Sequence, residues 1–263
     1  MISSLVAYQM RISVCAFSFS LSIILASGQS GSARPVTAAE ASAMPPVIVI
    51  GFVGGYIRHD DRAHTEVQLA ARLQAEYHSG VYVQAFENRR GNRAYREILR
   101  LLDVDHDGAM SVLEKQHARI IIYGHSWGAS ETVSLAQKLG KEDVPVLLTI
   151  QVDSVSKVGE NDGVIPANVA QAVNFYQLNG LVHGRSEIRA ADPARTQIIG
   201  NFRFNYKANP IRCRERYPWF DRIFLKTHTE IECDPKVWNQ VESLIRSQIA
   251  PVTPGAANRR SSE

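Results

Sequence analysis

Short apolar runs rich in β-branched residues alternate along the chain with segments whose apolar residues recur at helical spacing. Strand-like and helix-like segments that alternate in this way are typical of a mostly parallel sheet with helices on both faces. The pattern therefore predicts an α/β fold. The predicted strands are 47–50, 81–86, 119–123, 144–152, 173–178 and 222–226, and the predicted helices are 65–77, 92–102, 127–139, 167–172 and 235–249, with 196–206 left unassigned.

The first 28 residues have the pattern of an export signal. Arg11 precedes an apolar stretch at 12–26, which ends in small residues. The alternative is an uncleaved membrane anchor, but the stretch is short and rich in serine for a span of about 20 residues. We expect cleavage near Gly28 and a secreted or periplasmic protein with no stable membrane span after cleavage.

The rest of the chain is expected to hold one folded domain. Residues 29–44 are rich in Ser, Ala and Gly and predict a flexible leader, and 251–263 predict a disordered tail. The domain should therefore cover 45–250. Cys213 and Cys233 remain after removal of the signal, and an oxidising compartment would favour a disulfide between them, although two free thiols are an open alternative.

The composition argues against one class of partner. The chain has 263 residues, of which 45% are hydrophobic and 21% charged, and its formal net charge is only +3. Its basic residues form no stripe interleaved with aromatic residues, so we expect no nucleic-acid partner. The glycine loop at 51–55 matches neither the dinucleotide nor the nucleotide pattern, and no organic cofactor is expected.

The most informative segment is 120–129, where an apolar run ends in Gly-His-Ser-Trp-Gly and helix-forming residues follow. A Gly-x-Ser-x-Gly sequence between a strand and a helix is the pattern of a nucleophile elbow, in which the serine hydroxyl projects from a sharp turn. Ser126 is therefore the candidate nucleophile.

A nucleophilic serine needs a base to take its proton and an acid to orient that base. After such an elbow the chain order is serine, acid, histidine, so only His183 and His228 qualify, and His228 is favoured because it precedes the last helix. Asp153 is the candidate acid because it directly follows the apolar strand, with Asp162 and Asp192 as alternatives. The backbone N–H groups of Trp127 and Phe52 are the candidate donors to an oxyanion.

Residues 103–114 match the twelve-residue calcium loop position by position. Oxygen ligands fall at positions 1, 3, 5, 7, 9 and 12, and Gly108 occupies position 6, where the loop turns sharply. We expect a structural calcium site, because the segment after the loop is too short to form a paired hand. The predicted ligands are Asp103, Asp105, Asp107, Ala109, Ser111 and Glu114. A loop that keeps the turn but binds weakly is the alternative.

Three segments of the chain together resemble the α/β-hydrolase superfamily, in its lipase or esterase-like branch. They are the glycine loop at 50–55, the elbow at 124–128 and the histidine segment at 228–230, and the resemblance covers about 46–249. It implies an eight-stranded sheet and the hydrolysis of a carboxylic ester or thioester through an acyl-enzyme. The calcium loop is an insertion that most members lack.

The sequence thus favours an exported serine hydrolase that acts on a small-molecule or lipid-like acyl substrate. The scarcity of hydrophobic lid-like segments favours a modest ester. The alternative is a hydrolase-fold protein whose chemistry has lapsed and which serves as a calcium-dependent binding or structural module. An acyltransferase or amidase would use the same residues, because the acceptor is chosen by pocket shape.

Overall fold

The computed structural model describes residues 44–213, 217 and 225–249. The chain divides into two units, Met1–Thr37 and Ala38–Glu263, and all described residues belong to the second. The predicted signal and tail, and the predicted leader except for Met44, lie outside the described residues. Among the described helices, none is long and apolar enough to cross a bilayer.

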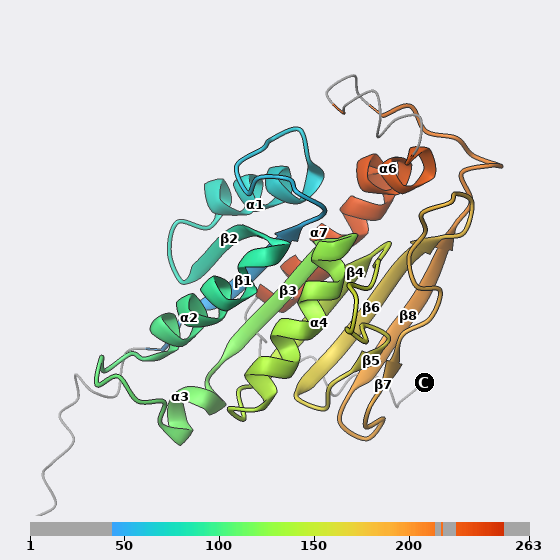
Figure 1. Cartoon of the computed structure of the whole chain (residues 1–263). Coiled ribbons are helices and arrows are strands. Elements are labelled where there is room, and N and C mark those ends of the chain that lie inside the picture. The colour runs from blue at the N-terminus through green and yellow to red at the C-terminus, as the bar shows by residue number, and fades with distance from the viewer. Residues whose placement is uncertain (1–43, 214–216, 218–224, 250–263) are drawn as a thin grey trace, which may run out of the picture. The chain divides into compact units, whose positions relative to one another are not determined.

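A parallel sheet of six strands forms the centre of this unit, in the order β2-β1-β3-β4-β6-β8 (Figure 1). Every neighbouring pair runs parallel, so the carboxyl ends of all six strands lie at one edge. A separate two-stranded sheet pairs β5 (Val164–Ile165) with β7 (Arg189–Ala190). The six strands are β1 (Val47–Val53), β2 (Val81–Glu87), β3 (Arg119–His125), β4 (Val146–Val152), β6 (Val169–Gln177) and β8 (Gln197–Phe204).

Helices cover both faces of the six-stranded sheet, as predicted (Figure 1). Side chains alternate between the faces along a strand, so Ile120 and Ile122 of β3 enter one core while Ile121 and Tyr123 enter the other. The first core is completed by α2 and α4, and the second by α1 and α7. The helices are α1 (Thr65–Glu76), α2 (Gly91–Leu102), α3 (Val112–Gln116), α4 (Trp127–Gly140), α6 (Lys226–Cys233) and α7 (Pro235–Ile249), with a short 3-10 helix η1 (Asn88–Arg90).

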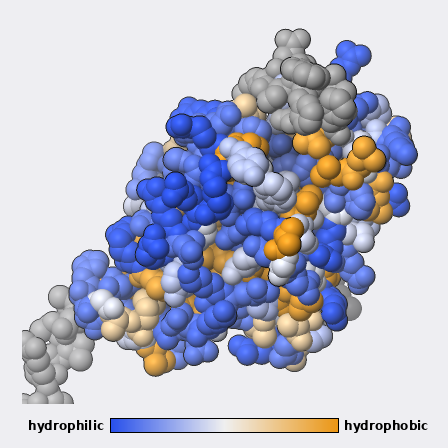
Figure 2. Space-filling model, viewed as in Figure 1, coloured by the Kyte–Doolittle hydropathy of each residue, from blue (hydrophilic) through white to orange (hydrophobic). Residues whose placement is uncertain are grey.

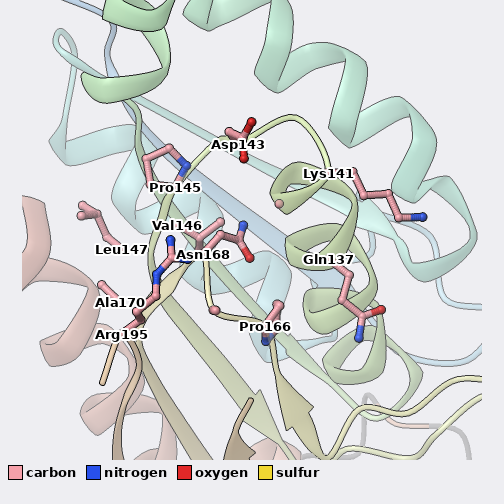
Figure 3. Close-up of a pocket in the computed structure, with 12 residues that line it drawn as sticks. Gln137, Lys141, Asp143, Pro145, Val146, Leu147, Pro166, Asn168, Ala170 and Arg195 are labelled. Carbon is pink, nitrogen blue, oxygen red and sulfur yellow. The ribbon is translucent and has the colours of Figure 1, made fainter. Parts of the chain in front are cut away.

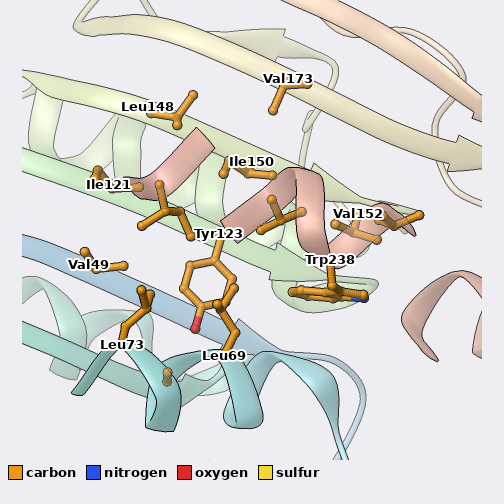
Figure 4. Packing of buried hydrophobic residues seen from close by; sticks show 14 of the residues in the cluster. Val49, Leu69, Leu73, Ile121, Tyr123, Leu148, Ile150, Val152, Val173 and Trp238 are labelled. Carbon is orange, nitrogen blue, oxygen red and sulfur yellow. The ribbon is translucent and has the colours of Figure 1, made fainter. Parts of the chain in front are cut away.

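Tyr123 occupies the middle of the second core (Figure 4). Its ring packs edge-on against Trp238 of α7, with centroids 6.4 Å apart, and its hydroxyl donates to the backbone carbonyl of Glu66, 2.9 Å away. The hydroxyl is therefore satisfied although the side chain is fully buried. This contact fixes the first turn of α1 against the strand that leads into the elbow.

Three expectations about the elements were wrong. The helix expected at 167–172 is the first half of β6, which continues through the strand expected at 173–178. A short apolar segment suits either state, and pairing with β4 and β8 on both sides selects the strand. Lys226 begins α6 and does not end a strand, while 222–224 lie outside the described residues. The main sheet has six strands in the described residues, fewer than the eight implied by the resemblance.

A disulfide joins Cys213 to Cys233, the last residue of α6. The two cysteines are 20 positions apart, and closing a loop of this length in the unfolded chain stabilises the fold by about 3 kcal/mol. We expect the double variant Cys213→Ala, Cys233→Ala to lose about this much free energy of unfolding, as measured by urea denaturation. A reductant should destabilise the parent equally and leave the variant unchanged; a loss below about 1 kcal/mol would contradict the prediction.

Candidate active site

Ser126 stands at a sharp turn between β3, which ends at His125, and α4, which begins at Trp127. Its backbone has a φ of +58°, which a residue with a side chain rarely adopts. Glycines flank it because a Cβ at Gly124 would lie 2.5 Å from the carbonyl carbon of Gly128, and one at Gly128 would lie 2.3 Å from the Phe52 oxygen. The segment therefore has the geometry of a nucleophile elbow.

The structure brings Ser126, His228 and Asp153 into one chain of hydrogen bonds. The Nε2 atom of His228 lies 2.8 Å from the Ser126 hydroxyl oxygen, and its Nδ1 atom lies 2.6 Å from a carboxylate oxygen of Asp153. When Asp153 is ionised, Nδ1 carries the proton and Nε2 accepts from the serine hydroxyl. Asp153 and His228 are buried, whereas Ser126 is half-buried and open to solvent.

Further donors hold the carboxylate of Asp153 in place. Its Oδ1 atom accepts from the backbone N–H groups of Gly184, 2.6 Å away, and Gln177, 3.2 Å away. Its Oδ2 atom accepts from the Gln177 side chain at 2.8 Å. No pattern in the sequence singled out Gln177 or Gly184, because their role depends on how β6 and the loop after it pass beside the end of β4.

The two alternative acids lie in other networks. Asp162 is buried but accepts from Ser154, Ser156 and Arg185. Asp192 accepts from the backbone of Ala194 in a turn. The Nδ1 atom of His183, the alternative base, lies near a backbone carbonyl, that of Gly184, 3.3 Å away.

The two expected oxyanion donors differ in their surroundings. Trp127 is the first residue of α4, and the first N–H groups of a helix have no partner within it. Phe52, in contrast, lies inside β1, in register with Phe86 and Gly124 on the neighbouring strands. A Cβ at Gly54 would lie 3.0 Å from the Cβ of Ser126, so the structure favours the loop at Gly54 over Phe52 as the source of the second donor.

A second group of titratable side chains lies buried beside the elbow. His125 packs against His228, with ring centroids 4.5 Å apart, and its Nδ1 atom lies 3.6 Å from both Glu66 and Glu232. Burial lowers the pKa of His125 to about 4 and raises that of Glu66 well above its ordinary value. Burial alone would lower the pKa of His64, but its hydrogen bond to Glu232 and the charges of the neighbouring carboxylates together outweigh burial and raise the pKa to about 9.

The predicted calcium loop precedes α3. Carboxylate oxygens of Asp103, Asp105 and Glu114 lie within 4.8 Å of one another, and the Oδ1 atom of Asp103 is buried without a hydrogen-bond partner. Gly108 has a φ of +79°, as the sharp turn requires. A hard-oxygen cluster with an unpartnered carboxylate oxygen fits a calcium ion.

The other expected ligands lie outside this three-carboxylate group. Asp107 accepts from the backbone N–H of Ala109, and Ser111 caps α3 in a reciprocal pair with Glu114. The two carboxylate oxygens of Glu114 accept hydrogen bonds from the backbone N–H groups of Val104 and Ser111. A bound ion would compete with these hydrogen bonds for Glu114.

A large pocket lies away from this chemistry. It has a volume of about 590 Å³ and lies at the amino ends of β4 and β6, where Pro145, Asn168 and Arg195 line it (Figure 3). Ser126, His228 and Asp153 are not among its lining residues. Since ligands of parallel α/β sheets bind beyond the carboxyl ends of the strands, this pocket is not the candidate active site.

No protein-family model matches the chain, and no curated protein matches it in sequence. Solved structures resemble it at low identity. A cutinase-like protein from Cryptococcus sp. is 14% identical with a TM-score of 0.38, and the match covers 79% of this chain and 97% of that protein. A dienelactone hydrolase-like promiscuous phosphotriesterase from metagenomic libraries is 12% identical, with a TM-score of 0.36 and coverage of 80% and 89%. An acetyl xylan esterase is 10% identical, with a TM-score of 0.35 and coverage of 78% and 99%.

The fold is identified by features of the structure itself. A parallel sheet is covered by helices on both faces, an elbow follows β3, and the chain order is serine, aspartate, histidine. These are the features of the α/β-hydrolase fold.

Proposed function

We propose that this protein is an exported serine hydrolase that cleaves a carboxylic ester or thioester through an acyl-enzyme on Ser126. One observation carries the proposal: His228 lies 2.8 Å from the Ser126 hydroxyl and 2.6 Å from the Asp153 carboxylate. These are hydrogen-bond distances at which a base can activate a serine and an acid can orient the base.

The reaction follows from this arrangement. The Ser126 oxygen attacks the substrate carbonyl while its proton passes to Nε2 of His228, and Asp153 stabilises the resulting imidazolium. The N–H of Trp127 and a donor from the loop at Gly54 stabilise the oxyanion. When the carbonyl re-forms, the bond to the leaving group breaks and His228 protonates that group. Water then attacks the acyl-enzyme by the same route and releases the acid and the free serine.

Exposed apolar side chains support an acyl substrate with an apolar part. Tyr56 follows β1, Val158 follows β4 and Leu181 follows β6, so all three come after strand ends at the edge that carries Ser126. Tyr56 also packs edge-on against Trp127. On the face shown in Figure 2, orange side chains interrupt a mostly hydrophilic surface. A short or medium acyl chain is the class that such separate contacts would favour.

Export is supported by the sequence of the first 28 residues and by the disulfide, since structural disulfides persist in oxidising compartments. A structural calcium ion at the 103–114 loop is part of the proposal.

We expect calcium to raise the melting temperature of the chelator-treated protein. Extracellular calcium modules bind at roughly 0.1 to 1 mM, so about 10 mM calcium should stabilise the fold by about 2 kcal/mol, a shift of about 5 °C. Scanning calorimetry measures the shift, and the variant Asp105→Asn, Glu114→Gln should not show it. A shift that magnesium reproduces fully, or that the variant retains, would contradict the site.

The proposed function is tested by labelling with a fluorophosphonate probe, which reacts with activated serines. We expect the mature parent to be labelled and Ser126→Ala to remain unlabelled. Each labelling reaction is run in calcium and in a chelator, so that loss of labelling on chelation would connect the loop to the site. Failure of the folded parent to react in calcium would contradict the proposed activity.

A further inference from the structure

Four buried side chains meet beside the elbow and take no part in the chain from Ser126 to Asp153. His64 precedes α1, Glu66 lies in its first turn, His125 ends β3 and Glu232 lies in α6. Each is less than 5% exposed. Two acids and two imidazoles at such depth require an explanation, because buried charged groups are costly unless they are paired.

The hydrogen bonds within the structure leave this cluster incomplete. Both carboxylate oxygens of Glu66 and both ring nitrogens of His125 are buried without a hydrogen-bond partner. Within the described residues, the ion-pair partners of Glu66 and Glu232 are histidines, and no lysine or arginine takes that place. Most buried polar groups are satisfied, so unpartnered atoms on two neighbouring side chains indicate a missing ligand between them.

The spacing of these atoms fits a small cation. The Nδ1 atom of His125 lies 3.6 Å from Oε1 of Glu66 and 3.6 Å from Oε2 of Glu232. Ligand atoms of His64, Glu66 and Glu232 lie within 4.8 Å of one another. Zinc binds nitrogen and oxygen ligands at about 2.0 to 2.2 Å, which places tetrahedral ligands about 3.4 Å apart. His125 is not one of that three-residue group, but its Nδ1 atom faces two of its members and can act as the fourth ligand. A bound ion would replace the hydrogen bond of 2.6 Å that now joins Nδ1 of His64 to Oε1 of Glu232.

We infer that His64, Glu66, His125 and Glu232 form a structural site for a divalent transition-metal ion, with zinc as the best fit. Imidazole nitrogens suit zinc, and two carboxylates balance the charge of a divalent ion. This donor set differs from the all-oxygen cluster of the calcium loop. The ion would join the start of α1, the end of β3 and α6, which carries His228, and would thereby position the elbow and the histidine without contacting substrate.

Cobalt(II) tests this inference without an activity assay, because its visible absorption is strong in four-coordinate sites and weak in octahedral oxygen sites. The mature protein with Asp105→Asn and Glu114→Gln, stripped by a chelator, is titrated with cobalt and, separately, zinc. We expect one ion per chain, intense visible bands, displacement of cobalt by zinc, and a melting temperature that rises with zinc concentration.

Glu66→Gln keeps the size of the side chain and removes its charge. Loss of a residue that only supports a metal ligand lowers affinity by about 10- to 100-fold, so loss of a ligand itself should lower cobalt affinity by about 100-fold or more. Glu76→Gln, on the exposed end of the same helix, should bind as the parent does. His64→Gln provides a second ligand change if the first variant does not fold.

Three results would overturn the inference: no stoichiometric binding by the parent, unchanged binding in the folded ligand variants, or binding that is lost in His228→Ala but kept in Glu66→Gln. The last result would place the ion on the catalytic histidine. Since none of these measurements uses turnover, a failure here is distinguishable from a failure of the proposed hydrolase activity.

Discussion

Replacement of Ser126 by alanine is expected to lower kcat/KM for a short-chain p-nitrophenyl ester by about 10⁴-fold or more, with little change in the melting temperature. The serine oxygen is the only atom of the hydrogen-bonded chain that would bond to the substrate carbon. Without it, the acyl-enzyme cannot form, and only the slower attack of water near the oxyanion donors remains. The substitution removes no packing from the hydrophobic core, because the Ser126 side chain is half-buried and open to solvent, so the melting temperature should change little.

Ser134→Ala is the matched control for this variant. Ser134 lies two turns further along α4, and its hydroxyl donates to the Ser130 carbonyl at 3.4 Å, far from the reaction. Its kcat/KM should stay within about twofold of the parent value, because its hydroxyl bonds within α4 and not to Ser126, His228 or Asp153. Equal activity of Ser126→Ala and the parent would assign the hydrolysis to another residue.

The elbow could be predicted from the sequence because its signal is local. Five consecutive residues contain the whole pattern. Gly124 and Gly128 have to be glycines because a Cβ at Gly124 would clash with Gly128, and one at Gly128 would clash with Phe52 of β1. The partners of Ser126 are far less local. His228 is 102 positions from the serine and 75 from Asp153. The order serine, acid, histidine along the chain was therefore the main guide to the base and the acid.

The acid remained open among three aspartates for a physical reason. All three lie between Ser126 and His228 in the chain, and the sequence does not reveal which loop turns back towards the histidine. The structure selects Asp153 because β6 lies beside β4 and delivers Gln177 to the same carboxylate.

The buried cluster beside the elbow gave no signal in the sequence. Glu66 and Glu232 lie on helices whose sequences contain several charged residues, where a carboxylate is ordinarily solvated. Their burial depends on the packing of α1 and α6 around His125, a contact between segments more than 160 positions apart, as the bond from His64 to Glu232 shows. Patterns of spacing along one helix cannot reveal such a contact.

Asp153→Asn should lower kcat by about 10⁴-fold while the protein remains folded, and the hydrogen bonds around the carboxylate explain why. Two backbone N–H groups point at Oδ1, so the amide oxygen of an asparagine must take that position. Its NH₂ group then takes the place of Oδ2, where it loses the hydrogen bond from the Gln177 side chain and faces Nδ1 of His228. Nδ1 must become an acceptor, and the ring proton moves to Nε2. An Nε2–H group facing Ser126 cannot take the proton of the hydroxyl.

Asp162→Asn and Asp192→Asn separate this effect from a general loss of carboxylate charge. Arg185 donates to Asp162 at 2.6 Å, so Asp162→Asn should lose stability. Its kcat should stay within about threefold of the parent value, since the tautomer of His228 is unchanged. Asp192→Asn should change neither quantity, because its side chain caps a turn by accepting one backbone N–H, which an amide oxygen also accepts. Steady-state kinetics and thermal unfolding of the three variants decide the assignment. A loss of about 10⁴-fold in the Asp162 or Asp192 variant, with Asp153→Asn active, would move the acid to that residue and would show that the bond from Asp153 to His228 only holds the histidine in place.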